Sequence, residues 1–86
     1  MEKRIGTITI VIGDKTAVQN VNEILSQYSD GILSRQGLPL RDKGLNIINI
    51  VIEAPLDEIN ALTGKLGRLN GVEVKAIVSK QKKSNE

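Results

Sequence analysis

The segment 45–52 constrains the fold of this chain more than any other stretch. Six of its eight residues are apolar and four are isoleucine. Because β-branched side chains are stiff and pack well on a pleated surface, the segment is predicted to be a strand. Alternate residues of a strand point to opposite faces, and here both faces are apolar. Such a strand belongs in the middle of a sheet. One face is expected to carry the chain's own helices, and the other to meet a partner or tolerate water.

The flanking sequence predicts three more strands and two helices. Apolar residues alternate in two further segments and recur at helical spacing in two others. One extended segment is less apolar and contains Gly37 and Pro39, which favours an edge strand or a bulge. The predicted elements, in chain order, are strand 5–12, helix 16–29, strand 32–40, strand 45–53, helix 55–69 and strand 72–78.

Turn and cap residues mark the boundaries of these elements. Thr16 with Gln19 fits a capping box at the start of the first helix, and Asp14 is a competing N-cap. Gly31 suits a left-handed cap at the end of that helix. Gly44 is available for positive φ in the turn that precedes the central strand.

The order strand, helix, strand, strand, helix, strand predicts an α+β fold, the ferredoxin-like βαββαβ sandwich. It has a four-stranded antiparallel sheet with two helices on one face. The first and third strands are central in this topology, and they are the richest in isoleucine. Residues 1–79 are expected to form one domain. Residues 80–86 form a basic tail that is either solvated or a contact for an acidic partner or nucleic acid.

Composition excludes several functions. There is no histidine or cysteine. Their absence argues against a metal site and against catalysis, and no cofactor is expected. Residues 1–79 carry nine basic and nine acidic residues, so the +2 charge belongs to the tail and nucleic-acid binding is disfavoured. Tyr28 is the only aromatic residue. The N-terminus resembles no signal peptide and no segment could span a membrane, so a cytoplasmic location is expected.

Four runs of the sequence resemble one small bacterial family, described as regulators of the iron-only hydrogenase system, with an ACT-like fold. The resemblance covers roughly residues 2–79. It implies a stand-alone regulatory module, not an enzyme, that oligomerises and has no defined ligand. The runs are Val21-Asn22-Glu23-Ile24-Leu25, Arg35-Gln36-Gly37-Leu38-Pro39, Leu62-Thr63-Gly64-Lys65-Leu66-Gly67 and Gly71-Val72.

The resemblance to ligand-binding ACT domains is partial. Those that bind amino acids tend to carry Asp-x-Pro-Gly between the first strand and the first helix. Here the run is Asp14-Lys15-Thr16-Ala17, in which Thr16 and Ala17 replace the proline and glycine. A methyl group at Ala17 would crowd such a site, so the sequence does not favour amino-acid binding in the usual mode.

Two positions are candidate sites for a small anion. Arg35, Gly37 and Pro39 share one side of a regular strand, where an arginine beside a bare glycine would suit a carboxylate or phosphate. The other reading is a bulged edge strand with a solvated arginine. Gly13 and Asp14 precede a helix N-terminus, which favours anions, although an ordinary turn and cap would look the same.

The second face of the sheet is the candidate oligomer interface, forming a dimer or tetramer. It mixes apolar residues with threonine and asparagine, which can hydrogen-bond across an interface without burying a charge. Gly64 and Gly67 lie in the second helix, where glycine is unfavourable. Either they permit close approach of a partner, or the helix tolerates them without any functional role. A purely structural interaction domain with no ligand is the alternative function. The interface residues are Ile5, Thr7, Thr9, Val11, Leu45, Ile47, Asn49, Val51 and Ile77.

Overall fold

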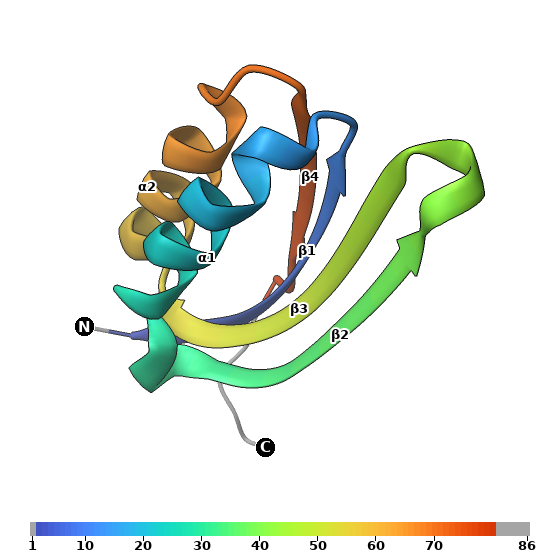
Figure 1. The fold of residues 1–86 in the computed structure, drawn as a ribbon. Coiled ribbons are helices and arrows are strands. Elements are labelled where there is room, and N and C mark those ends of the chain that lie inside the picture. The colour runs from blue at the N-terminus through green and yellow to red at the C-terminus, as the bar shows by residue number, and fades with distance from the viewer. Residues whose placement is uncertain (1, 81–86) are drawn as a thin grey trace.

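The computed structural model describes residues 2–80 and has the predicted α+β architecture. Its strands form one antiparallel sheet in the order β2-β3-β1-β4, and both helices cover the same face (Figure 1). The ferredoxin-like βαββαβ prediction is therefore confirmed. The elements are β1 (Lys3–Ile12), α1 (Val18–Ser26), β2 (Ile32–Leu40), β3 (Leu45–Pro55), α2 (Leu56–Gly67) and β4 (Val72–Val78).

β1 and β3 are the two central strands. β1 pairs with β3 along its whole length, from Lys3 opposite Pro55 to Ile12 opposite Asn46. β3 runs two residues further than the predicted end at residue 53, because Pro55 closes the strand and stands at the N-cap of α2. β2 and β4 are the edges. The proline in β2 predicted an edge position for that strand.

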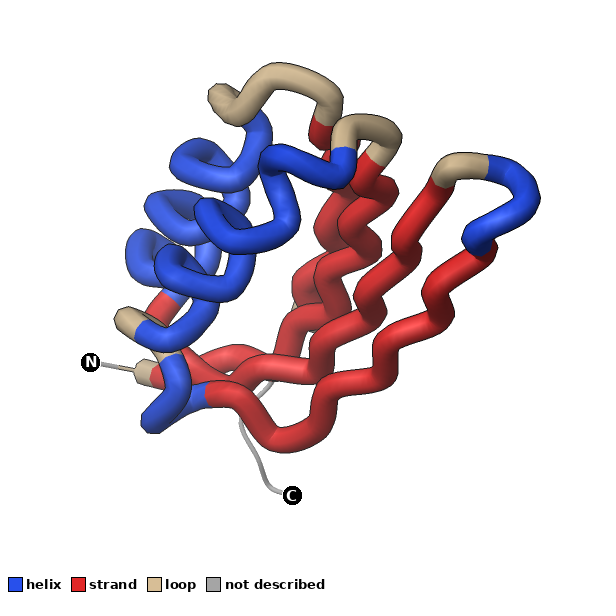
Figure 2. The backbone as a smooth tube through the Cα atoms, viewed as in Figure 1, coloured by secondary structure: helices blue, strands red, loops and turns tan. Residues whose placement is uncertain are grey.

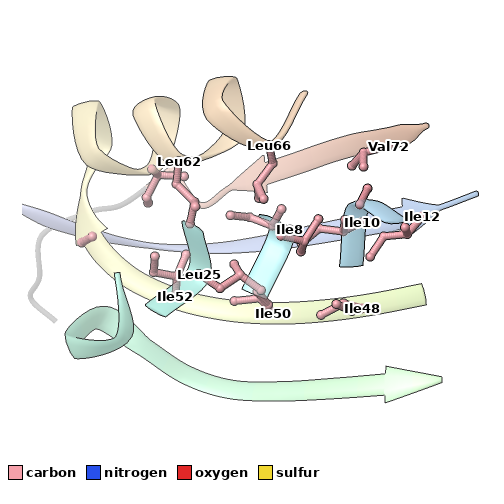
Figure 3. Packing of buried hydrophobic residues seen from close by; sticks show 14 residues of the cluster. Ile8, Ile10, Ile12, Leu25, Ile48, Ile50, Ile52, Leu62, Leu66 and Val72 are labelled. Atoms are coloured by element: carbon pink, nitrogen blue, oxygen red, sulfur yellow. The ribbon is translucent and has the colours of Figure 1, made fainter. Parts of the chain in front are cut away.

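The core lies between the sheet and the helices. Figure 3 shows isoleucines of β1 and β3 pointing toward leucines of α1 and α2. All of these isoleucines are at most 7% exposed. Burying one such side chain contributes roughly 1.5–3 kcal/mol, so this single layer holds the fold together. The buried residues are Ile8, Ile10, Ile12, Ala17, Val21, Leu25, Ile48, Ile50, Ile52, Ala54, Ile59, Leu62, Leu66 and Val72.

The prediction for Gly31 was wrong. The first helix ends at Ser26, and Gly31 lies in a short 3-10 turn, Ser29–Gly31. Among residues 2–80 only Gly44 and Gly71 have positive φ. Gly31 is needed for space instead, since a Cβ there would lie 2.7 Å from the backbone oxygen of Glu53.

The start of the first helix resolves the two predicted caps in favour of Asp14. A 3-10 turn, Lys15–Ala17, leads into α1, and the Asp14 side chain accepts a hydrogen bond from the backbone N–H of Thr16. Thr16 is thus held by Asp14 and is not itself the capping residue of α1, whose N-cap position is Ala17.

The β2–β3 hairpin is the most extended part of the molecule. Figures 1 and 2 show it running beyond the ends of the helices and curving away from β1 and β4. The hairpin turn contains a 3-10 turn, Arg41–Lys43, and then Gly44 at φ 67°, as its sequence predicted. None of the helices in residues 2–80 is long and apolar enough to cross a membrane.

Candidate functional site

A cleft lies between the β2–β3 hairpin and the turn that joins β1 to α1. Its volume is about 520 Å³. We call it the hairpin cleft. One wall comes from the β1–α1 turn and the other from the two arms and the turn of the hairpin. The lining residues are Gly13, Lys15, Pro39, Arg41, Gly44, Leu45 and Asn46.

The hairpin cleft is basic. Lys15 and Arg41 line it from opposite walls, and no carboxylate is among the lining residues. Within residues 2–80, neither cation donates a hydrogen bond to another residue through its side chain. Pro39 and Leu45 give the cleft an apolar part, and Asn46 adds one amide. The chemistry suits an anion of small size with an apolar body.

Asp14 lies next to the cleft but is already occupied. Its Oδ1 accepts hydrogen bonds from Thr16 Oγ1 at 2.8 Å and from Thr16 N at 3.0 Å. These two bonds, the side-chain one first, hold the pKa of Asp14 below its ordinary value of 3.8. The carboxylate therefore stays charged near neutral pH and fixes the turn that carries Lys15.

Gly71 fixes the same turn from the other side. Gly13 N donates to the backbone oxygen of Gly71 at 2.7 Å. Gly71 has φ 76°, and a Cβ on it would lie 2.5 Å from Asp14 Cβ. The loop between α2 and β4 thus touches the β1–α1 turn closely. In the sequence, Gly71 stands out only as part of the run Gly71-Val72, because contact between two distant loops leaves no local pattern.

The residues of the Arg-x-Gly-x-Pro run share one side of β2, as their spacing predicted. They pair with Ile50, Ile48 and Asn46 of β3, which places them on the helix-covered side. Arg35 reaches across to α1, where its guanidinium donates to Asn22 Oδ1. A Cβ at Gly37 would meet no atom within 4 Å.

The structure therefore divides the predicted ligand residues into two groups. Gly13 and Pro39 line the hairpin cleft together with Lys15 and Arg41, and Asp14 lies beside it. Arg35 and Gly37 lie further along β2 and do not line it. Sequence reasoning missed Arg41, since only the curvature of the hairpin brings it near the β1–α1 turn.

A larger cavity at the opposite end of the helices does not share the purely basic charge of the hairpin cleft. Its volume is about 680 Å³ and its lining mixes lysines with carboxylates. Lys65 lies 5.1 Å above the ring of Tyr28 and also donates to Gln27 Oε1, so this cation already has partners. Residues 2–80 contain no cluster of three or more potential metal ligands.

The sheet face away from the helices carries every residue of the predicted interface. We call it the open face. Pairing sets its members, since each lies opposite another residue of the same face on the neighbouring strand. Ile77 is 75% exposed, Leu38 55% and Ile5 39%, although all three are large apolar side chains. β2 adds Ser34, Gln36, Leu38 and Leu40, and the charged members are Lys3, Glu53, Glu73 and Lys75.

The comparisons with known proteins agree on family and fold. Residues 4–76 match the family model "TM1266-like: Iron-only hydrogenase system regulator, putative". The uncharacterised protein TM1266 from Thermotoga maritima has a solved structure that is 44% identical, with a TM-score of 0.88 over 92% of this chain and 100% of that one. No curated protein matches the chain.

More distant structures share the fold alone. The ACT domain of the GTP pyrophosphokinase of Chlorobium tepidum is 21% identical, with a TM-score of 0.68 over 99% of this chain and 96% of that one. A protein of unknown function from Galdieria sulphuraria is 12% identical, with a TM-score of 0.69 over 95% of this chain and 48% of that one. The family description is that of a regulator and not of an enzyme. The chain belongs to the TM1266-like family of iron-only hydrogenase system regulators and has the ACT-like fold.

Proposed function

We propose that this chain is a stand-alone, oligomeric regulatory module that senses a small organic anion in the hairpin cleft. The observation that carries the proposal is the placement of Lys15 and Arg41 on opposite walls of a cleft with no carboxylate in its lining. Regulation of a hydrogenase system is the role that the family description supplies.

The chemistry of the two cations favours a carboxylate or phosphate group. A guanidinium presents paired N–H donors that match such groups, and a lysine ammonium adds a second charge. Pro39 and Leu45 would contact the apolar part of the ligand and partly exclude water. Because the ligand would touch both the β1–α1 turn and the hairpin, its binding would tie together two parts that otherwise meet only through the sheet.

The test is a ligand-dependent thermal shift with matched variants. Citrate and inorganic phosphate should raise the melting temperature of the wild type, and Arg41→Ala and Lys15→Ala should abolish the rise. Lys43→Ala is the control, because it removes one positive charge from the same hairpin turn outside the cleft. An equal loss in Lys43→Ala would reduce the effect to general electrostatics.

Arg35→Ala decides between the two anion positions suggested by the sequence. If the anion binds in the hairpin cleft, this variant keeps the thermal shift. If the Arg-x-Gly-x-Pro run forms the site, Arg35→Ala abolishes the shift while the fold stays intact, and Arg41→Ala does not.

The alternative is a purely structural interaction domain with no ligand. The open face supports it, since an exposed apolar sheet needs no ligand to bind a partner. Oligomerisation without any anion-dependent shift across carboxylates and phosphate would favour this alternative.

A further inference from the structure

The open face is striped across its strands. Pairing across β2, β3, β1 and β4 aligns its residues into rows that run perpendicular to the strands. The middle row is polar throughout, the first row has an apolar centre of Ile47 and Val11, and the third row has Val51 beside Thr7 at its centre. The first row is Leu38, Ile47, Val11 and Glu73; the middle row is Gln36, Asn49, Thr9 and Lys75; the third row is Ser34, Val51, Thr7 and Ile77.

The middle row has a spare hydrogen-bond donor at its centre. Thr9 Oγ1 donates to Asn49 Oδ1 at 2.9 Å. The Asn49 amide nitrogen donates to no other residue among residues 2–80. A surface that covered this row with apolar atoms would bury that N–H without a partner, which is unfavourable. The face therefore selects a partner with a polar row of its own in the same place.

We infer that the partner is a second copy of this chain, packed open face on open face about a two-fold axis that runs parallel to the strands between β1 and β3. This inference names the contact of the oligomer in the proposed function and rests on that proposal. Each row then lies on the same row of the other copy. Ile47 meets Val11 of the other copy, Asn49 meets Thr9 and Val51 meets Thr7. The apolar centre of the first row therefore meets itself, and amides meet hydroxyls in the middle row.

Charge selects this axis over the other possible one. A two-fold axis along the middle row would also pack the middle row of one copy on the middle row of the other. It would, however, place the Lys75 side chains of the two copies opposite each other. The axis parallel to the strands places Lys75 opposite Gln36 and Glu73 opposite Leu38. Glu73 and Lys75 of both copies then lie on the edge strand β4, at the rims, where their ends reach water. The remaining charges, Lys3 and Glu53, lie at one end of the central strands. Strands of the two sheets run nearly parallel, as in an aligned sandwich.

The available area fits a modest dimer. With strands ~4.8 Å apart and ~3.3 Å per residue, the open face covers roughly 500 Å² in each copy. The total of roughly 1,000 Å² is at the lower limit for a specific interface. Dimerisation is therefore expected to depend on concentration and to be sensitive to a single charge.

The first experiment puts a charge at the centre of the face without disturbing the core. Thr9 is exposed, so Thr9→Arg should fold normally by circular dichroism. It should raise the dimer Kd measured by sedimentation equilibrium at least about tenfold, since it buries an unpaired charge. The control is Leu56→Lys, on an apolar residue that is 38% exposed and lies on α2. An unchanged Kd in Thr9→Arg, or an equal rise in Leu56→Lys, would overturn the interface.

The second experiment tests the axis. Val11→Glu and Ile47→Lys should each weaken self-association, and an equimolar mixture should restore dimers, because the two new charges meet across the proposed contact. With the two-fold axis along the middle row, Val11 of one copy and Ile47 of the other lie two rows apart, so mixing the two variants would not restore dimers. If the mixture does not restore dimers although Thr9→Arg disrupts the wild-type dimer, the proposed axis is wrong.

The anion response and the self-association of the wild type separate the two proposals. The absence of stabilisation by citrate or phosphate would overturn anion sensing while the sedimentation results stand. A wild type that responds to anions but never dimerises would overturn the interface alone.

Discussion

The two sides of the sheet are built from the same four strands but differ in how deeply their side chains are buried. On the helix-covered side, Ile8, Ile10 and Ile12 of β1 are at most 1% exposed. On the open face, Ile5 of β1 is 39% exposed and Ile77 of β4 is 75% exposed. Two helices are enough to complete one side only. The chain therefore folds around one layer and leaves large apolar side chains of the other side exposed.

The largest expected effect comes from breaking the covered side. Ile50→Ala should lower the free energy of unfolding by about 2–5 kcal/mol, because the residue is 1% exposed and leaves a cavity. The matched change on the open face, Ile77→Ala, should cost less than about 0.5 kcal/mol in the monomer. Urea unfolding at a concentration where the protein is monomeric measures both. Similar losses in the two variants would contradict the difference between the sides.

The next effect concerns the loop contact at the end of the covered side. Gly71→Ala should cost about 2 kcal/mol or more, since it combines positive φ with a 2.5 Å approach to Asp14 Cβ. Gly44→Ala is the control, because it has φ 67° and no atom within 4 Å. It should cost only about 1 kcal/mol. If both cost the same by urea unfolding, the close loop contact has no energetic weight.

A smaller effect tests the outer surface of the helices as a competing interface. Gly64 lies in α2, and a Cβ there would meet no atom of the chain within 4 Å. Gly64→Ala should therefore stabilise the fold by about 0.5–1 kcal/mol through helix propensity and leave the sedimentation unchanged. A lost or weakened oligomer would show that a partner sits on α2 instead of the open face.

The smallest effect is a pH dependence at the β1–α1 turn. Asp14 has a lowered pKa in the folded state, so its stabilising contribution is complete above about 3.8 and is lost as pH falls through the lowered value. Thr16→Val removes the hydroxyl donor that is the first cause of the shift. An NMR titration should find the pKa of Asp14 below 3.8 in the wild type and closer to it in Thr16→Val. An identical pKa in both would assign the shift to another cause.

Much of the fold could be predicted because the spacing of apolar residues along the sequence indicates the strands and helices. Alternation in 5–12 and 45–53 gave the central strands and separated the residues under the helices from those on the open face. Pro39 placed β2 at an edge correctly. The alternation gave the members of the open face from β1, β3 and β4 for the same reason, since a strand has only two sides.

The features that could not be predicted depend on contacts between distant segments. Gly31 and Gly71 are required by close approach to Glu53 and Asp14, and nothing in their local sequence indicates either neighbour. The hairpin cleft arises because the β2–β3 hairpin curves past the helices toward Lys15. Sequence alone gave two of its lining residues, Gly13 and Pro39, but no reason to place them together. The predictions for residues 81–86 lie outside the described residues.

Sedimentation velocity over a dilution series tests the central claim most directly. The wild type should sediment as a dimer at high concentration and dissociate on dilution. The double variant Ile47→Lys with Val51→Lys should sediment as a folded monomer throughout, since it places like charges on both copies of the open face. A wild type that remains monomeric at every concentration, or a double variant that sediments as the wild-type oligomer, would contradict the account.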